Sequence, residues 1–184
     1  MIRKLHNPKS ELYYHLKEFI QTTHFPWSYS AKSTPMDEES SEYQDFPFYS
    51  HRFINRPRWG TLSARYLYPE VCSDLTDKFY PLLEEIFYVN KIRVGCICRF
   101  NANCQHPIPD DDRPSIPHYD HPFRHKNMLI YLTPAGGETL IMDDDGNVTD
   151  VHDPKEDDII IFEGLHCYRA PKKDRRIVLV VTYI

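Results

Sequence analysis

Histidine and aspartate side chains that could bind a metal ion gather in the segment PSIPHYDHPFRHKNMLIYLTPAGGETLIMD, residues 114–143. His118 and Asp120 are two positions apart, so in an extended strand both side chains project from the same face and can bind one ion. Two histidines and one carboxylate on one face of Fe(II) leave open positions, an arrangement typical of non-haem oxygenases. The candidate for the second histidine is His166, which follows the apolar run DDIIIFEG. Taken alone, an HxD pair is equally compatible with ordinary core or loop residues.

A lone cation follows this cluster. Arg176 lies ten residues after His166 and begins the apolar run RIVLVVTYI. A charge in a buried strand is costly unless an anion pairs with it, and a ligand carboxylate would be such a partner. The alternative is a surface residue at a strand edge. Arg175 competes for the role, because a shift of one residue exchanges the two faces of a strand.

Short runs rich in β-branched and aromatic residues dominate the second half of the chain and predict strands. They are residues 91–100, 127–134, 137–143, 158–164 and 175–184. Their connections are mostly too short for helical crossovers, which favours antiparallel pairing in a barrel or sandwich. Gly136 and Gly137 predict a tight turn between two of these strands.

The first half of the chain is expected to support this β-structure. Residues 10–21 show helical spacing of apolar residues, with Ser10 as the N-cap. Residues 68–87 predict a second helical segment, in which Pro81 should cause a kink or a break into two pieces. Residues 24–53 combine Pro, Ser and acidic residues with aromatics, which predicts a long loop that could cover a substrate cleft.

Composition narrows the class of protein. The 184 residues suit one domain, and a net charge of −5 argues against general binding of nucleic acid. No apolar segment is long enough to span a bilayer and the start does not resemble a signal peptide, so we expect a cytoplasmic protein that does not bind membranes. Five cysteines without a CxxC pair suit reduced thiols.

The series His118, Asp120, LIYLTPAGGETLI, His166 and Arg176 resembles the core of the Fe(II)- and 2-oxoglutarate-dependent dioxygenases, closest to the prolyl-4-hydroxylase-like branch. The resemblance covers residues 92–184. It implies an α+β, mainly β fold: a double-stranded β-helix (jelly-roll, cupin-like) barrel with N-terminal helices packed against it. Residues 1–184 would form a single dioxygenase domain, with 1–90 as helical and loop support that includes a substrate lid, and 91–184 as the core with the metal site.

The resemblance also implies roles for residues. His118, Asp120 and His166 would ligate Fe(II), and Arg176 would pair with the distal carboxylate of 2-oxoglutarate. Tyr131 would donate to the same carboxylate, although a tyrosine in a strand is as often a packing residue. Thr139 would line the same pocket.

The implied reaction consumes 2-oxoglutarate and O2, releases succinate and CO2, and hydroxylates a protein side chain, such as a prolyl residue, or a small molecule. Ascorbate is an accessory reductant of such enzymes. Because Asp120 is present where halogenating members lack a carboxylate, hydroxylation is the expected outcome. The sequence selects neither a substrate nor an oligomeric state.

The chain departs from the family pattern before the HxD pair. Phe100 stands where a tyrosine is usual and cannot donate a hydrogen bond, so Arg99 or Asn101 would have to supply that contact. Residues 101–117 would be an insertion at the mouth of the barrel. The remaining histidines of this region are expected to be loop or supporting residues, since a facial set needs three ligands: His106, His121, His125 and His152.

Other functions stay open at this point. Oxidative demethylation of nucleic acid is disfavoured by the acidic balance, and because the strand DRRIVLVVTYI lacks the second arginine and the asparagine of the nucleic-acid alkyl-repair dioxygenases. A cupin-like metal isomerase or a non-catalytic binding module would leave Arg176 without a cosubstrate. Dependence on 2-oxoglutarate separates these possibilities.

Overall fold

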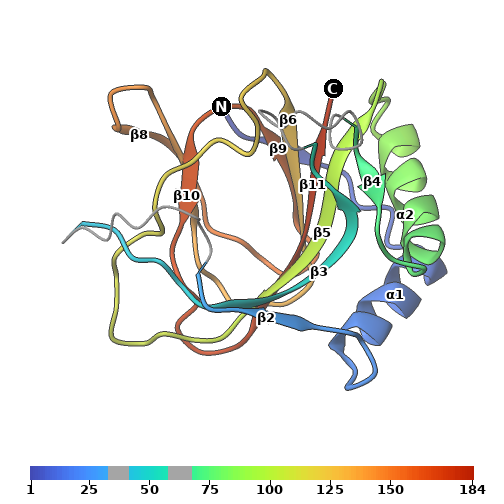
Figure 1. Cartoon of the computed structure of the whole chain (residues 1–184), viewed down its shortest axis with the longest axis horizontal. Helices are drawn as coiled ribbons and strands as arrows, with labels where there is room; N and C mark the ends of the chain where they lie inside the picture. The colour runs from blue at the N-terminus through green and yellow to red at the C-terminus, as the bar shows by residue number, and fades with distance from the viewer. Residues whose placement is uncertain (33–41, 58–67) are drawn as a thin grey trace.

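The computed structural model describes residues 1–32, 42–57 and 68–184. Within these residues the strands form two antiparallel sheets (Figure 1). The larger, eight-stranded sheet has the order β1-β9-β6-β11-β5-β3-β2, with β4 paired to β3; the smaller has the order β10-β7-β8. This mainly β architecture, with two helices, confirms the expected barrel fold.

The bounds of the elements are as follows. The larger sheet contains β1 (Arg3–Leu5), β2 (Ser28–Ser30), β3 (Phe48–Asn55), β4 (Glu70–Val71), β5 (Ile97–Gln105), β6 (Lys126–Tyr131), β9 (Ile159–Phe162) and β11 (Arg176–Tyr183). The smaller contains β7 (Thr139–Met142), β8 (Val148–His152) and β10 (His166–Tyr168), and the helices are α1 (Glu11–Gln21) and α2 (Thr76–Val89).

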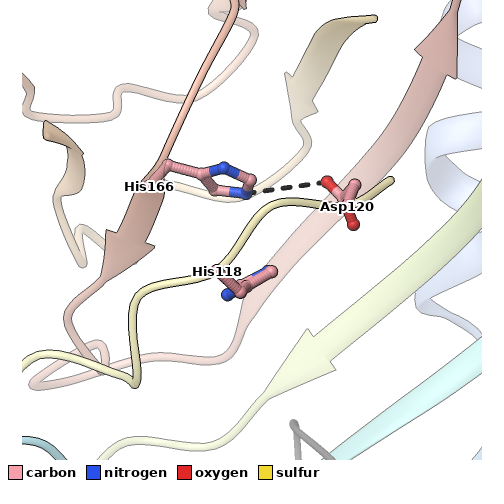
Figure 2. Close-up of side chains that lie close together, drawn as sticks. All are labelled: His118, Asp120 and His166. Carbon is pink, nitrogen blue, oxygen red and sulfur yellow. Dashed lines mark ion pairs between the residues drawn. The ribbon is translucent and has the colours of Figure 1, made fainter. Parts of the chain in front are cut away.

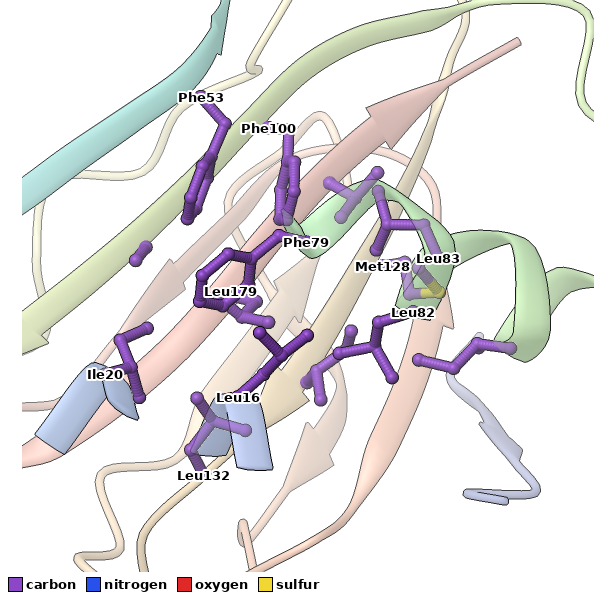
Figure 3. Packing of buried hydrophobic residues seen from close by; sticks show 14 of the residues in the cluster. Leu16, Ile20, Phe53, Phe79, Leu82, Leu83, Phe100, Met128, Leu132 and Leu179 are labelled. Carbon is purple, nitrogen blue, oxygen red and sulfur yellow. The ribbon is translucent and has the colours of Figure 1, made fainter. Parts of the chain in front are cut away.

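The two faces of the larger sheet pack against different parts of the protein. On β11, Ile177 and Leu179 belong to the main apolar core, which the side chains of α1 and α2 complete on the outer face of the sheet (Figures 1 and 3). Val178 and Val180 point the other way, because side chains alternate along a strand, and pack inside the barrel with Ile141 of the smaller sheet. The outer face therefore anchors the helices, while the inner face is available for a site.

Both helices match their sequence signals. The Ser10 side chain accepts a hydrogen bond from the backbone N–H of Tyr13 at 3.2 Å, as an N-cap should. Its hydroxyl also donates to Glu85 of α2 at 2.7 Å. The helix α2 is continuous through Pro81, so the predicted break is wrong. Pro81 and Asp77, whose carbonyl loses its helical donor, are both exposed, and water can satisfy that carbonyl.

Several boundaries differ from the expectation. Residues 24–53 are not one loop, because β2 and β3 lie within or across this range and β3 pairs with residues 100–104 of β5. Residues 70–71 are a strand rather than the start of a helix. Strand β5 continues to Gln105, so the first part of the expected insertion at 101–117 belongs to the sheet.

Three further strands, β1, β8 and β10, were not anticipated. The strand β1 adds to β9 at the edge of the larger sheet, and β8 pairs with β7. Both strands are short, and each is held in an extended conformation by its partner strand. The partner of β1 is far along the chain, and the partner of β8 lies across a turn. The first 90 residues therefore contribute strands to the larger sheet as well as helices. Residues 33–41, which include acidic residues of the predicted loop 24–53, lie outside the described residues. The role of this loop as a substrate lid stays a prediction.

The predictions about the cysteines and about membrane-spanning segments can be compared with the structure. All five cysteines are free. In the described part of the chain, neither helix is long and apolar enough to cross a membrane.

Candidate metal and cosubstrate site

The two histidines of the predicted metal site lie on neighbouring segments. His166 begins β10, and the backbones of His118 and His166 exchange two hydrogen bonds of 2.9 and 3.2 Å. The two imidazole rings are consequently close, with centroids 4.6 Å apart. His118 is not in a regular strand as expected; an isolated bridge to β10 sets its position instead.

The backbone orients both rings in the same way. The Nδ1 of His118 lies 3.1 Å from the carbonyl oxygen of Ile116, and the Nδ1 of His166 lies 3.1 Å from that of Gly164. With the proton on Nδ1, each ring donates to its carbonyl and presents the lone pair of Nε2. Burial and the neighbouring His118 lower the pKa of His166 to about 4, so its ring is neutral at pH 7, as a metal ligand must be.

Asp120 completes the cluster (Figure 2). One ligand atom from each of His118, Asp120 and His166 lies within 4.8 Å of the others, and Asp120 Oδ2 is 3.6 Å from His166 Nε2. Burial alone would raise the pKa of the Asp120 carboxyl, but the charges of Arg99 and of nearby cations lower it well below the usual range. Two imidazoles and one carboxylate suit Fe(II), so the donor set fits the expected metal.

A second group of predicted residues meets deeper in the barrel. Arg176 is 7% exposed, and its guanidinium lies 5.2 Å from the ring centroid of Tyr131 and 5.3 Å from that of Tyr168. The hydroxyls of Tyr131 and Thr139 are 2.8 Å apart, and Arg176 Nη2 is 3.4 Å from Thr139 Oγ1. Arg175 is exposed, so Arg176 is the arginine that faces inward.

Arg176 is buried without an anion. Within the described residues it forms no ion pair, and its Nε has no hydrogen-bond partner. Gly137 keeps the space beside it: a Cβ there would lie 3.2 Å from Arg176 Cδ and 2.6 Å from the carbonyl oxygen of Arg169. Gly137 also has φ of 83° and Gly136 of 71°, backbone conformations that favour glycine. A carboxylate would satisfy the orphan guanidinium.

The spacing of the two groups suits a short dicarboxylate. In the smaller sheet His166 pairs with Ile141, and Thr139 is two residues further along β7. Two strand residues span roughly 7 Å. One molecule with an acid group at each end of a short carbon chain, such as 2-oxoglutarate, could therefore reach from the metal ligands to Arg176. The three predicted cosubstrate residues thus fit the expected molecule.

Strand β5 lines the inner face with polar side chains. Arg99, Asn101, Asn103 and Gln105 pair in register with the inward residues Thr182, Val180, Val178 and Arg176 of β11. Phe100 points to the outer core, where its ring stacks on Phe53 at 4.3 Å. Its lack of a hydroxyl is therefore irrelevant to the site.

Arg99 and Arg56 are the site residues that sequence reasoning identified least well. Arg99 was one of two alternatives for a contact, and it forms an ion pair with Asp120. Arg56, which follows β3, donates from Nη1 to the Asp120 carbonyl oxygen at 2.9 Å and was not predicted. No local signal reveals Arg56, because its partner is 64 residues away. Tyr168 was also missed, although its place two residues after His166 puts it on the same face.

The remaining histidines are not part of the metal cluster within the described residues. His121 is buried, with Nε2 2.7 Å from Thr182 Oγ1, and burial lowers its pKa to about 4. His125 has Nδ1 2.7 Å from the carbonyl oxygen of Phe123. His152 lies beside the Tyr131 ring, and His106 is exposed against Tyr49.

Comparison with known proteins supports this fold. No family model and no curated protein matches the chain. An oxidoreductase of the 2OG-Fe(II) oxygenase family from Burkholderia pseudomallei has a similar structure, with 17% identity and a TM-score of 0.62, over 86% of this chain and 72% of that chain. A prolyl hydroxylase from Trichoplax adhaerens, in complex with a hypoxia inducible factor oxygen degradation domain peptide fragment, is also similar. It has 12% identity and a TM-score of 0.54, and the match covers 100% of this chain and 83% of that chain.

At these identities the similarity establishes the fold. The chain has the barrel fold of the 2OG-Fe(II) oxygenases, among them a prolyl hydroxylase, which confirms the resemblance seen in the sequence at the level of architecture.

Proposed function

We propose that this protein is an Fe(II)- and 2-oxoglutarate-dependent dioxygenase that hydroxylates a protein side chain or a small molecule and releases succinate and CO2. The observation that carries the proposal is the combination of a His-Asp-His cluster with a buried arginine that has no anionic partner among the described residues, both inside one barrel. The proposal treats residues 1–184 as one cytoplasmic dioxygenase domain, and free cysteines are compatible with that location.

In this proposal His118, Asp120 and His166 hold Fe(II) on one face, and Arg176 binds the distal carboxylate of 2-oxoglutarate. Bound Fe(II) and 2-oxoglutarate would together supply the activation of O2 that oxidation of a C–H bond requires. The hydroxyls of Tyr131 and Thr139 orient the same carboxylate. Other inward side chains form an apolar wall that keeps water from the reacting atoms: Leu129, Ile141, Ile160, Phe162, Val178 and Val180.

The structure favours this function over its alternatives. A metal isomerase or a non-catalytic module gives no reason for a buried arginine that faces the metal cluster across about two strand residues. Nucleic acid as a substrate remains disfavoured by the net charge of −5. The peptide bound to the similar prolyl hydroxylase supports a protein side chain, such as a prolyl residue, as one substrate class.

An anaerobic titration of the Fe(II)-loaded protein with 2-oxoglutarate tests the proposal without a substrate. We expect the visible metal-to-ligand charge-transfer band of an Fe(II)·2-oxoglutarate complex in the wild type. His166→Ala should remove the band, whereas the matched control His106→Ala, an exposed histidine outside the cluster, should keep it. A folded, iron-bound wild type without the band would refute the dioxygenase proposal and favour a cupin-like protein that uses the metal alone.

Turnover gives a second criterion. Uncoupled consumption of O2 should require both Fe(II) and 2-oxoglutarate, should stop with a chelator, and should be prolonged by ascorbate. Activity that needs the metal but ignores 2-oxoglutarate would indicate an isomerase, and activity that survives chelation would indicate a binding module.

A further inference from the structure

Two arginines share the carboxyl group of Asp120. Arg99 of β5 forms an ion pair with Asp120 Oδ1, and Arg56 Nη2 lies 3.5 Å from the same oxygen. Arg56 Nη1 also donates to the Asp120 carbonyl oxygen at 2.9 Å. Both guanidiniums therefore lie at the metal-binding end of the barrel.

The charges at this end are not balanced by the protein. Within the described residues, Asp120 is the only carboxylate at ion-pair distance from Arg56 or Arg99. Both guanidiniums approach the same carboxylate oxygen, so the two cations lie close together and repel each other. Because Asp120 is also the proposed ligand of a dication, the local charge becomes more positive when the metal binds.

Orientation of Asp120 does not explain both arginines. One guanidinium suffices to hold a carboxylate, as such supporting hydrogen bonds do around metal ligands. Arg99, with its side chain 13% exposed, is well placed for that task. The Arg56 side chain is 41% exposed, and within residues 1–32, 42–57 and 68–184 its guanidinium forms polar contacts with Asp120 alone, which leaves donors for a molecule that enters the barrel.

This pair is separate from the cosubstrate arginine. Arg99 pairs in register with Thr182, six residues along β11 from Arg176. Six strand residues span roughly 20 Å between Cα atoms. Arg56 and Arg99 thus cannot bind the carboxylate that we assign to Arg176, and they are available for a different anion.

We propose that Arg56 and Arg99 bind a carboxylate of the primary substrate, so that the substrate is a small carboxylic acid, such as a free amino acid, whose acid group lies next to the oxidised carbon. Asp120 already shows that one carboxyl group can contact both guanidiniums. Arginine suits this task because its planar fork binds carboxylates through paired hydrogen bonds. The inference rests on the proposed dioxygenase function and names the substrate class for it.

The test uses the anaerobic Fe(II)·2-oxoglutarate complex and pairs of probes that differ only in charge. The probes are standard L-amino acids and 2-hydroxy acids, each with its carboxamide, for example L-proline and L-prolinamide. Binding is measured from the shift of the charge-transfer band and from the melting temperature. We expect at least one acid to bind at least tenfold more tightly than its amide.

Variants separate the two arginines from the rest of the site. Arg56→Gln and Arg99→Gln should each weaken binding of that acid by about ten- to a hundredfold, and Arg56→Gln should leave binding of the amide unchanged. Arg99→Lys should restore part of the loss. Arg124→Gln is the matched control, because Arg124 lies on the same loop as Asp120 but is 88% exposed and pairs with Glu163 at 3.0 Å.

The outcomes distinguish this inference from the proposed function. A normal band that responds to no acid, or equally to acids and amides, would overturn the substrate class and leave the dioxygenase intact. The same holds if both glutamine variants bind the acid like the wild type. Absence of the band itself would instead refute the proposed function. If Arg99→Gln lost the band, its role would be to position Asp120, and Arg56→Gln alone would then decide whether an acid is bound.

Discussion

Replacement of Arg176 by methionine should separate stability from cosubstrate binding. In the metal-free protein the buried guanidinium has no anionic partner in the part of the chain that the structure describes, a situation that costs several kcal/mol for an ion. Its contacts with the rings of Tyr131 and Tyr168 return about 0.5–2 kcal/mol each. Methionine has a comparable length, no charge and a flexible chain that fits the same apolar space. We therefore expect Arg176→Met to change the free energy of unfolding by between zero and about 2 kcal/mol in the stabilising direction.

The same substitution should abolish tight binding of 2-oxoglutarate. Loss of one partner from a buried, hydrogen-bonded charge pair costs about 2–5 kcal/mol, or roughly 30- to 5,000-fold in the dissociation constant. Arg175→Met is the control: Arg175 is exposed, so neither quantity should change by more than about 0.5 kcal/mol.

Two measurements decide the outcome. Urea unfolding of the metal-free proteins gives the free energy of unfolding, and the charge-transfer titration gives the dissociation constant of 2-oxoglutarate. Destabilisation of Arg176→Met by more than about 2 kcal/mol would mean that the guanidinium has an internal partner, contrary to the reasoning. Unchanged affinity for 2-oxoglutarate would show that the distal carboxylate binds elsewhere.

Two further predictions concern other parts of the fold. Gly136→Ala should lower the free energy of unfolding by about 1–2 kcal/mol through its positive φ alone. Gly137→Ala should lower it more in urea unfolding and should also weaken 2-oxoglutarate binding, because its Cβ would contact Arg176. Equal effects of the two variants would contradict this reasoning. Burial would raise the pKa of Asp157, but its hydrogen bonds, the one from Lys17 first, hold it below the usual 3.8. A lowered folded pKa contributes stability that is fully present above the unfolded value and is lost as the pH falls through the folded pKa. Asp157→Asn should therefore be less stable than the wild type by about 1–3 kcal/mol at pH 7, and this difference should shrink as the pH falls below 3.8. A constant difference across unfolding curves from pH 7 to 2.5 would argue against it.

Local patterns explain which parts of the fold were predictable from the sequence. Ser10 caps its helix through a neighbour three residues away, and the apolar spacing that follows is visible in any window of that length. The inward and outward alternation of β11 is equally local. For the site, the spacing of His118 and Asp120, the place of His166 after an apolar run and the place of Arg176 in an apolar strand indicated the metal cluster and the buried arginine. Tyr131 and Thr139 were named only through the resemblance to the dioxygenases.

The parts that were missed depend on partners distant in sequence. Strand β3 sits in a region rich in Pro and Ser and becomes a strand because residues 100–104 of β5 offer it an edge. The end of β5, RFNANCQ, alternates polar and apolar residues as a strand does, but it contains two asparagines, which are uncommon in strands. Its polar residues face the inside of a barrel, which is the reverse of the usual rule that inward means apolar. Arg56 could be connected with Asp120 only after the chain had folded.

The buried polar atoms without a hydrogen-bond partner indicate why polar residues face the inside of this barrel. Among the described residues, buried amide or guanidinium atoms of Asn103, Gln105, Asn127 and Arg176 have no hydrogen-bond partner, and all four residues lie on the inner face of β5, β6 and β11. Each such group lowers stability by about 1–3 kcal/mol relative to a satisfied one. The outer face of the same strands buries Phe100, Met128 and Leu179 in a continuous apolar core (Figure 3). A chain selected only to fold would have filled both faces alike. These amide and guanidinium groups lie on the face that carries the metal cluster and Arg176, whereas on the outer face of the same strands, among the described residues, the Tyr183 hydroxyl alone lacks a partner. We therefore attribute the inward groups to molecules that bind there, and saturating Fe(II) and 2-oxoglutarate should raise the melting temperature of the wild type more than that of Arg176→Met.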